Sequence, residues 1–485
     1  MDSLLFLCAR RLVAYHPLPA LPDDLYPVLF KAAFLDGRPL VLQDLVATWP
    51  FTELNLQRLV GHRELLGDHD CNLCVEAIIQ GMGAQLQQEL EEPGLDSSLR
   101  VLDMTGLPAG ITISFSTEAL AKACLELSKH QREFPRRGSK RHKGCSGGAR
   151  AVATPQPPGV DVLTDLFVIR HSYEILRDAL QDGGAGPLRL KCREFEAERI
   201  LASEIVTLLE SLDPSCLRRV DLRFNNLGLS GLLEILPRLS RFPELRSLKL
   251  QYSYLELQQQ TPESARRIHG IARQLGMLPR LRELNLRSSQ LSGKLHQILC
   301  DLQAPLESLE LASCSLAPAD LAFLSQSFHA PALKKLDLSG HDFSQGLLEP
   351  LQLLLEETSA SLLQLDLLEC HMNDSHLEAL LPTLLRCSRL RFLGLYGNSL
   401  STAALKDLLQ KTLELPDLRL VVYPYPMDCY KRVPPGPWWK VLVEDKELFA
   451  AVKAEFSQIL ANSKRTDLNW TCTPLDCRAL DYFSL

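Results

Sequence analysis

The sequence predicts an α/β solenoid, in which short parallel strands line one side of a stack of units and helices line the other. Residues 217–227 have the pattern L-x-x-V-x-L-x-x-N-x-L, which is typical of a short strand followed by a tight turn. The pattern returns along the chain, and each interval has room for a helix of about ten to twelve residues. One leucine column marks the period, at 25 to 36 residues per unit: Leu222, Leu250, Leu286, Leu311, Leu338, Leu367 and Leu395.

This pattern is that of leucine-rich repeats, and it predicts an elongated core shared by neighbouring units. One unit cannot bury its apolar side alone, so the units stack in a horseshoe with the strands on the concave face. The asparagine position follows each strand, where its side chain can bond the backbone of the turn. Asn225 and Asn398 occupy it in two repeats, and the other repeats carry Ser253, Ser289, Cys314, His341 and Cys370. We expect these repeats to be looser at the turn.

The divisions of the chain follow from where this periodicity holds. Residues 129–159 are rich in Lys, Arg, Gly and Pro, so we expect a disordered loop that is a solvated insert, a nuclear import signal or a contact for an anionic partner. The predicted segments are a helical N-terminal region at 1–95, a first degenerate repeat at 96–128, the loop at 129–159, further degenerate repeats at 160–216, regular repeats at 217–423 and a C-terminal cap at 424–485.

Composition excludes several classes of function. The chain has 485 residues and a net charge of −7, which gives no global attraction to nucleic acid. No apolar run reaches the roughly 18 residues of a membrane span, and no secretion signal is recognisable. We therefore expect a cytoplasmic protein with free cysteines, and the basic loop leaves a nuclear location open. Cys71 and Cys74 form a lone C-x-x-C pair without a second pair for zinc, and no catalytic motif is present, so we expect no metal, no cofactor and no enzymatic activity.

The first 30 residues contain two short patterns. Leu4, Cys8 and Leu12 are spaced four apart and would fall along one helix face, which is equally compatible with a packing helix. With Ser3 they resemble the BC box, whose leucine and cysteine bind elongin C. Residues 21–29 resemble the cullin-2 box that follows a BC box in cullin-RING receptors. That resemblance assigns cullin contacts to Leu21, Pro22, Leu25 and Leu29.

The N-terminal third also resembles a known family. The segment 21–34 has the pattern L-P-x-x-L-x-P-x-L-F-x-A-A-F, W-P-F follows at 49–51, and L-R-V-L-D-M at 99–104. These motifs are similar to those of the PRAME family of leucine-rich repeat proteins. The resemblance implies a PRAME-type horseshoe and a role as receptor in a cullin-2 ubiquitin ligase.

The predicted partner surface is the strand face of the regular repeats. Residues that flank the buried leucines point there, and acids in the middle repeats are followed by aromatic and aliphatic residues. We predict target contacts at Glu310, Asp337, Asp366, Leu368, Phe392 and Tyr396. The sequence thus favours a ligase adaptor, monomeric outside its complex, that binds elongin B/C, cullin-2 and a target protein for degradation. The alternative is a ligase-independent scaffold that regulates signalling or transcription.

Overall fold

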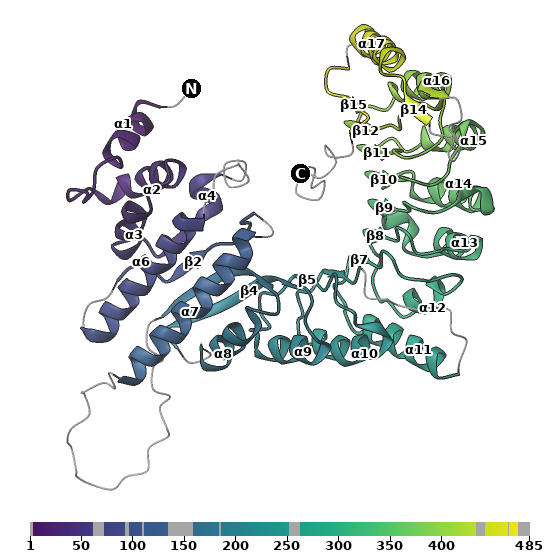
Figure 1. Cartoon of the computed structure of the whole chain (residues 1–485). Helices are drawn as coiled ribbons and strands as arrows, with labels where there is room; N and C mark the ends of the chain where they lie inside the picture. Colours follow the sequence, from purple (N-terminus) through teal and green to yellow (C-terminus); the bar gives the residue numbers. More distant parts are fainter. Residues whose placement is uncertain are drawn as a thin grey trace, which may run out of the picture. The chain divides into compact units, whose positions relative to one another are not determined.

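The computed structural model describes residues 3–61, 72–92, 97–108, 111–133, 159–183, 186–251, 262–432, 442–463 and 465–473 (Figure 1). The chain forms two compact units. Unit 1 comprises Met1–Asp221 with Arg241–Glu244, and unit 2 comprises Leu222–Ser240 with Leu245–Leu485. No described helix is both long enough and apolar enough to cross a membrane.

The predicted parallel sheet is confirmed. It has 13 strands that follow one another in chain order from β1 to β12, with β15 as the last neighbour. Unit 1 holds β1 (Glu53–Asn55), β2 (Val101–Asp103), β3 (Val160–Val168), β4 (Leu188–Ala197) and β5 (Arg219–Asp221). Unit 2 holds β6 (Ser247–Lys249), β7 (Glu283–Asn285), β8 (Ser308–Glu310), β9 (Lys335–Asp337), β10 (Gln364–Asp366), β11 (Phe392–Gly394), β12 (Leu420–Val422) and β15 (Asn469–Thr471).

Unit 1 begins with helices, as predicted, but it also contains strand β1, which the sequence reasoning missed. Its helices are α1 (Leu4–Leu12), α2 (Tyr26–Leu35), α3 (Pro39–Ala47), α4 (Leu56–Val60), α6 (Asn72–Glu91), α7 (Ile111–Glu133), α8 (Tyr173–Gly183) and α9 (Ala202–Ser211), with a 3₁₀ turn η1 at Asp23–Leu25. Helix α7 continues to Glu133, so the first residues of the predicted loop are helical. Residues 134–158 of that loop lie outside the described part of the chain.

Unit 2 repeats one arrangement, with strands β7 to β12 along one side and helices α12 to α16 along the other (Figure 1). Its helices are α10 (Gly228–Leu239), α11 (Pro262–Gly276), α12 (Leu295–Leu299), α13 (Pro318–Gln326), α14 (Leu348–Thr358), α15 (Asp374–Leu384), α16 (Thr402–Thr412) and α17 (Lys446–Ser463). Three 3₁₀ turns lie at Ala330–Ala332, Phe343–Gln345 and Met427–Cys429. In the predicted cap, β13 (Tyr430–Arg432) and β14 (Leu442–Glu444) form an antiparallel pair, and β15 extends the main sheet.

The leucine column forms the core between strands and helices. None of its seven members exposes more than 2% of its surface. Each lies one residue beyond its strand, and a second leucine or valine at the strand centre is buried beside it, such as Leu336 in β9. Because the register pairs Leu336 with Leu365 and Leu309, the apolar side chains form continuous rows across the sheet.

The asparagine position bonds the turn as predicted. The Asn398 Nδ2 atom donates to the carbonyl oxygens of Leu395 and Leu367, both at 2.8 Å. Its Oδ1 atom accepts from the backbone N–H groups of Cys370 and Met372, both at 3.0 Å. One amide therefore satisfies four backbone groups and ties one repeat to the preceding repeat.

The residues that replace asparagine reproduce only some of these bonds. The Cys314 thiol donates to the Leu286 carbonyl oxygen at 3.0 Å, and the Cys370 thiol donates to that of Leu338 at 3.3 Å. The hydroxyl of Ser289 is buried without a hydrogen-bond partner among the described residues. Thiols are weak donors, so the repeats with Cys314 and Cys370 have weaker turn bonds than the repeat that ends in Asn398. Ser253 lies outside the described residues.

The turns share a backbone feature that the sequence reasoning missed. The residue before the asparagine position is left-handed in six repeats: Phe224, Ser288, Ser313, Gly340, Glu369 and Gly397, with φ between 53° and 76°. Glycine takes this conformation freely, whereas other L-residues lose about 1 kcal/mol or more there. The fold therefore tolerates strain at Phe224, Ser288, Ser313 and Glu369 to keep the turn constant.

The leucine column yields a stability prediction. Leu338→Asp places a carboxylate in the buried row without a partner, so the free energy of unfolding should fall by on the order of 3–5 kcal/mol. Urea unfolding followed by circular dichroism measures it. The matched control is Leu353→Asp, since Leu353 lies in α14 and is 53% exposed, where surface substitutions change stability by about 0.5 kcal/mol or less. Equal unfolding midpoints for the two variants would refute the placement of Leu338.

Candidate partner-binding surfaces

Helix α1 is fixed at both ends by polar contacts. The Ser3 hydroxyl accepts a hydrogen bond from the Phe6 backbone N–H at 3.2 Å and so caps the helix. Near the other end, Arg10 forms a two-pronged ion pair with Asp36, which follows α2, with nitrogen–oxygen distances of 2.6 to 3.0 Å. These contacts hold α1 against α2 in one orientation.

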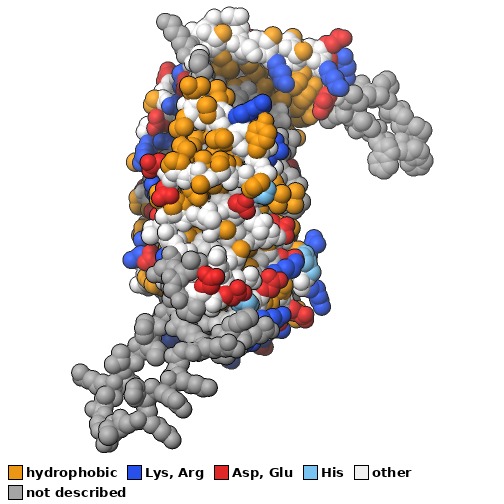
Figure 2. All heavy atoms as spheres, turned by 90° about the vertical axis from the view of Figure 1, so that its left-hand side faces the viewer, with side chains coloured by type: hydrophobic (Ala, Val, Ile, Leu, Met, Phe, Trp, Pro, Cys, Tyr) orange, Lys and Arg blue, Asp and Glu red, His pale blue; other side chains and the backbone are white. Residues whose placement is uncertain are grey.

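The same helix is apolar on its outer side. Ala9 and Val13 are buried, whereas Leu4 is 79% exposed, Leu5 56% and Leu7 50%. Cys8 and Leu12 are also exposed. At roughly 100° per residue, Leu4, Cys8, Leu12 and Leu5 fall within one arc, which lies beside the side of the helix that carries Ala9 and Val13. Figure 2 views the molecule from the left-hand side of Figure 1, where α1 lies, and it shows hydrophobic side chains gathered on the upper part of that face.

All four residues of the predicted elongin site therefore lie together on α1. Ser3 begins the helix, and Leu4, Cys8 and Leu12 line its exposed arc. The pattern did not identify Leu5 and Leu7, which enlarge this apolar surface, although both could have been found in the leucine-rich string itself. Exposed apolar surface is common at sites of protein interaction.

The predicted cullin box is only partly accessible. Pro22 is exposed, and Leu21 and Leu25 are half-buried around the short turn η1. Leu29, by contrast, is buried in α2, so its predicted availability to cullin-2 is wrong. The reason is that α2 belongs to the core of unit 1, where the Phe30 and Trp49 rings meet edge to face with centroids 5.7 Å apart.

On the strand side of unit 2, charged residues pair across neighbouring strands. The Glu310 carboxylate accepts hydrogen bonds from Lys335 Nζ and Asn285 Nδ2, both at 2.9 Å. Burial opposes ionisation of Glu310, but the charges of Lys335, Lys249 and Arg287 outweigh it and hold the Glu310 pKa below its ordinary value. Glu310 is therefore ionised, and basic residues of the same chain balance its negative charge. The sequence reasoning did not identify Lys335, because pairing across strands needs the register.

The next two predicted acids lie side by side. Asp337 in β9 pairs in register with Asp366 in β10. Asp337 is nearly buried and accepts from the Ser339 hydroxyl at 2.6 Å and the Ser339 backbone N–H at 3.0 Å, with Arg287 at 3.6 Å. The Asp366 Oδ1 atom is buried without a hydrogen-bond partner among the described residues. Burial and then the neighbouring Asp337 charge raise the Asp366 pKa, which Lys335 offsets only in part.

The Asp366 carboxyl also depends on Gly394 of the adjacent strand. A Cβ atom at Gly394 would collide with Asp366 Oδ1 and would lie 2.9 Å from a methyl group of Leu368. The missing side chain is therefore what lets this carboxyl lie flat on the sheet. The predicted acids are largely internal to the fold, and the charge that they offer to a partner is reduced.

Of the three apolar residues predicted for the target site, only Leu368 and Tyr396 are accessible. Leu368 and Tyr396 are half-buried, as a contact surface requires, but Phe392 is 1% exposed. Phe392 packs with Leu420 and Val422 of β12, and Tyr396 lies against the three. The exposure that the sequence predicts for Phe392 is wrong, because β12 adds apolar neighbours that the repeat pattern does not show.

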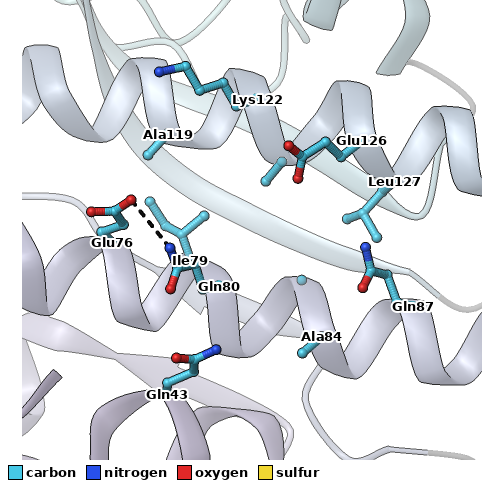
Figure 3. A pocket seen from close by; sticks show the side chains of 12 residues that line it. Gln43, Glu76, Ile79, Gln80, Ala84, Gln87, Ala119, Lys122, Glu126 and Leu127 are labelled. Atoms are coloured by element: carbon cyan, nitrogen blue, oxygen red, sulfur yellow. Dashed lines mark hydrogen bonds between the residues drawn. The ribbon is translucent and has the colours of Figure 1, made fainter. Parts of the chain in front are cut away.

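A groove of about 330 Å³ lies in unit 1 between helices α6 and α7 (Figure 3). Its lining includes the small residues Gly83 and Ala84 of α6 and Ala119 of α7, together with Lys122 and Glu126 of α7. The Gln80 amide donates to Glu76 at 3.3 Å within α6. The groove brings together no pair of groups suited to acid–base or nucleophilic chemistry, and its lining is that of a helix–helix seam.

These features define the class of protein. A parallel sheet with helices on one side, a leucine column and asparagine-bonded turns make this a leucine-rich repeat protein. Residues 185–480 match the PRAME C-terminal domain, and residues 6–109 match the PRAME N-terminal domain. The chain therefore belongs to the PRAME family.

Similar proteins cover the chain from end to end. It is 43% identical over 511 residues to leucine-rich repeat-containing protein 14 of Xenopus laevis, with 100% of both chains covered. The protein of that name from Homo sapiens is 43% identical over 513 residues, again with 100% of both chains covered. Among solved structures, the leucine-rich repeat-containing protein LegL7 from Legionella pneumophila matches with a TM-score of 0.36 and 17% identity, over 63% of this chain and 92% of that chain.

The raised pKa of Asp366 gives a pH prediction. In the unfolded chain Asp366 ionises near its ordinary pKa of 3.8, whereas in the folded chain it keeps its proton to higher pH. The folded state then binds more protons, so the wild type loses stability as pH rises above about 4, by up to about 1.4 kcal/mol per pH unit. Asp366→Asn removes this loss, and its stability relative to wild type should rise between pH 5 and pH 8 in urea unfolding.

The control is Asp342→Asn, because Asp342 is only half-buried and hydrogen bonds from Ser344 lower its pKa. It should show no such rise with pH. A constant difference between Asp366→Asn and wild type from pH 5 to pH 8 would contradict the protonated state of Asp366.

Proposed function

We propose that this protein is a substrate-recognition adaptor of a cullin-2 RING ubiquitin ligase. In this proposal α1 binds elongin C with elongin B, the segment 21–25 contacts cullin-2, and the strand side of unit 2 holds the target protein for degradation. The chain itself performs no covalent chemistry. It raises the effective concentration of the target beside a charged ubiquitin-conjugating enzyme.

The exposed apolar arc of α1 is the observation that carries the proposal. An amphipathic helix normally buries its apolar side, yet Ala9 is the one buried residue of α1, and Leu4, Leu5 and Leu7 are each at least 50% exposed. Covering one leucine side chain stabilises a complex by roughly 1.5–3 kcal/mol. Leu4 and Cys8 are the positions that the BC-box resemblance assigns to the elongin C pocket, and both side chains are accessible without unfolding.

The cullin contact is proposed for the accessible part of its box. Pro22 is exposed, and Leu21 and Leu25 are half-buried beside it, so these three residues can contact a partner without rearranging α2. The buried Leu29 would act indirectly, by fixing α2 beneath them.

The target contact is proposed for the strand side, where solenoids commonly bind partners. Leu368 and Tyr396 supply half-buried apolar surface, and the Arg287 side chain is 37% exposed. Glu310, Asp337 and Asp366 would act mainly by holding these neighbours in place, since their own charges are neutralised or protonated within the sheet.

The proposal predicts capture of elongin B and C by the full chain. In the double variant Leu4→Ser/Cys8→Phe, the first change removes an apolar contact and the second makes the side chain too large for the pocket that would receive Cys8. Recovery of elongin B and C with the purified chain should therefore fall at least about 10-fold. Immunoblotting of the affinity-purified complex measures this. The matched control is Leu73→Ser, because Leu73 is an exposed leucine on α6, outside α1, and it should leave recovery unchanged.

Thermal unfolding by circular dichroism shows whether both variants keep their fold. Absence of elongin B and C from the wild-type complex would refute the adaptor role. Target capture that survives deletion of residues 1–30 while elongin is absent would instead favour the ligase-independent scaffold.

A further inference from the structure

The residues that precede strands β6 to β12 form a row along one edge of the sheet in unit 2. Each member of this row after the first donates its backbone N–H to the carbonyl oxygen of the member before it, at 2.7 to 2.9 Å. Strands β7 to β12 are stacked in this order in Figure 1, so neighbouring members lie about 4.8 Å apart across the sheet. The row, which we call the basic edge, consists of Arg246, Arg282, Glu307, Lys334, Leu363, Arg391 and Arg419.

The side chains of the basic edge are mostly of one sign. Five of the seven members are basic and one is acidic. Arg246 and Arg419 are exposed, and the other three basic members are half-buried. Two further exposed arginines, Arg280 and Arg389, each lie two residues before a basic member. Like charges on adjacent strands repel each other and lower the stability of a sheet. Binding of an anionic partner explains a row of one sign, which the fold alone does not favour.

Carboxylates of unit 2 balance only part of this charge. Glu307 accepts a hydrogen bond from Lys334 Nζ at 2.7 Å and lies 4.0 Å from Arg282 Nε. At the other end of the row, Asp467 forms an ion pair with Arg419. Two carboxylates are therefore shared among three basic members, and the remaining two basic members receive none.

Those remaining members are Arg246 and Arg391. Neither side chain forms an ion pair or a hydrogen bond within the described part of the chain. Arg391 lies beside Leu363, which is half-buried and adds apolar surface, and Arg389 is exposed next to both. A guanidinium group without a partner offers all five of its N–H donors to a ligand. The two arginines are therefore the strongest anchor points of the basic edge.

The geometry of the row favours an extended acidic peptide as its ligand. Arginine binds carboxylates through two parallel hydrogen bonds. Seven strands span about 29 Å, which an extended peptide of about nine residues matches. Nucleic acid fits less well, because single strands are held by aromatic side chains placed between basic ones and the row contains no aromatic residue. Glu307 also interrupts the row, and the chain has a net charge of −7.

We propose that the basic edge of unit 2 binds an extended acidic segment of a partner protein, with Arg246 and Arg391 as its main anchors. This edge lies where the strands begin, whereas Leu368 and Tyr396 follow the ends of β10 and β11. The inference goes beyond the proposed adaptor role, because it involves neither elongin nor cullin-2. Exposed charges are screened beyond about 10 Å at roughly 0.1 M salt, so the complex is sensitive to salt.

Fluorescence anisotropy of a labelled peptide tests the proposal. The probe is an extended peptide of about ten residues in which glutamate and serine alternate, so that all its carboxylates can face one side. The purified full chain should bind it, and Arg246→Glu or Arg391→Glu should weaken binding at least about 5-fold, because each change replaces an attraction by a repulsion. Raising the salt concentration from about 0.05 M to about 0.3 M should weaken binding by the wild type as well.

Arg266→Glu is the matched control, because Arg266 is an exposed arginine on α11, outside the basic edge, and the net charge changes equally. It should leave the affinity within about 2-fold of wild type, and thermal unfolding shows whether all variants keep their fold. No binding by the wild type, equal weakening by all three variants, or equal binding of a lysine–serine peptide would overturn the proposal. Tighter binding of an oligothymidine of equal length would assign the edge to nucleic acid instead. These samples contain no elongin, so a failed adaptor role does not affect the result.

Discussion

The packing of one leucine column beneath three-residue strands is the interaction on which the rest of this structure depends. A strand of three residues cannot persist alone, and helices α12 to α16 have only 5 to 11 residues, so neither layer is stable without the other. The column leucines, none more than 2% exposed, join strand, turn and helix in every unit. Asn398, Cys314 and Cys370 then bond backbone carbonyl oxygens of the preceding repeats. Register, turn geometry and spacing all follow from this arrangement.

Because the core lies between strands and helices, the side chains on the opposite face of the strands do not belong to the leucine core and can be charged or apolar. In the middle repeats this face is a set of cross-strand pairs such as Glu310 with Lys335, and at the end it becomes the apolar cluster around Phe392. Helix α1 is a second surface of this kind, held in place by Arg10 and Asp36 while its leucines remain exposed. Both surfaces are built on elements whose positions the core already fixes, which is the condition for binding with little loss of conformational freedom.

The sequence was sufficient to predict the repeat architecture, because the leucine spacing recurs at seven positions and each position of the pattern has one physical role. It predicted the strands that precede the column leucines, such as β9 before Leu338 and β10 before Leu367. It did not predict β1 and β15, since three residues with one apolar side chain, such as Asn469–Thr471, carry no period. These two strands belong to the sheet through neighbours that only the fold supplies.

The candidate sites were harder to predict because accessibility is a property of packing. The BC-box spacing gave the exposed residues of α1, but the cullin-box resemblance assigned a contact to Leu29, which is buried in the core around Trp49. Likewise, the acids of the strand side were found by position, whereas their neutralisation depends on Lys335 and Arg287 across the sheet. Hydrogen exchange of the full chain, alone and with elongin B and C, tests the account most directly. The strand amides of β7 to β11 should exchange slowest in both samples, and those of α1 should exchange rapidly until elongin slows them. Amides of α1 as protected as the strands without elongin, or unchanged when it is added, would contradict the account.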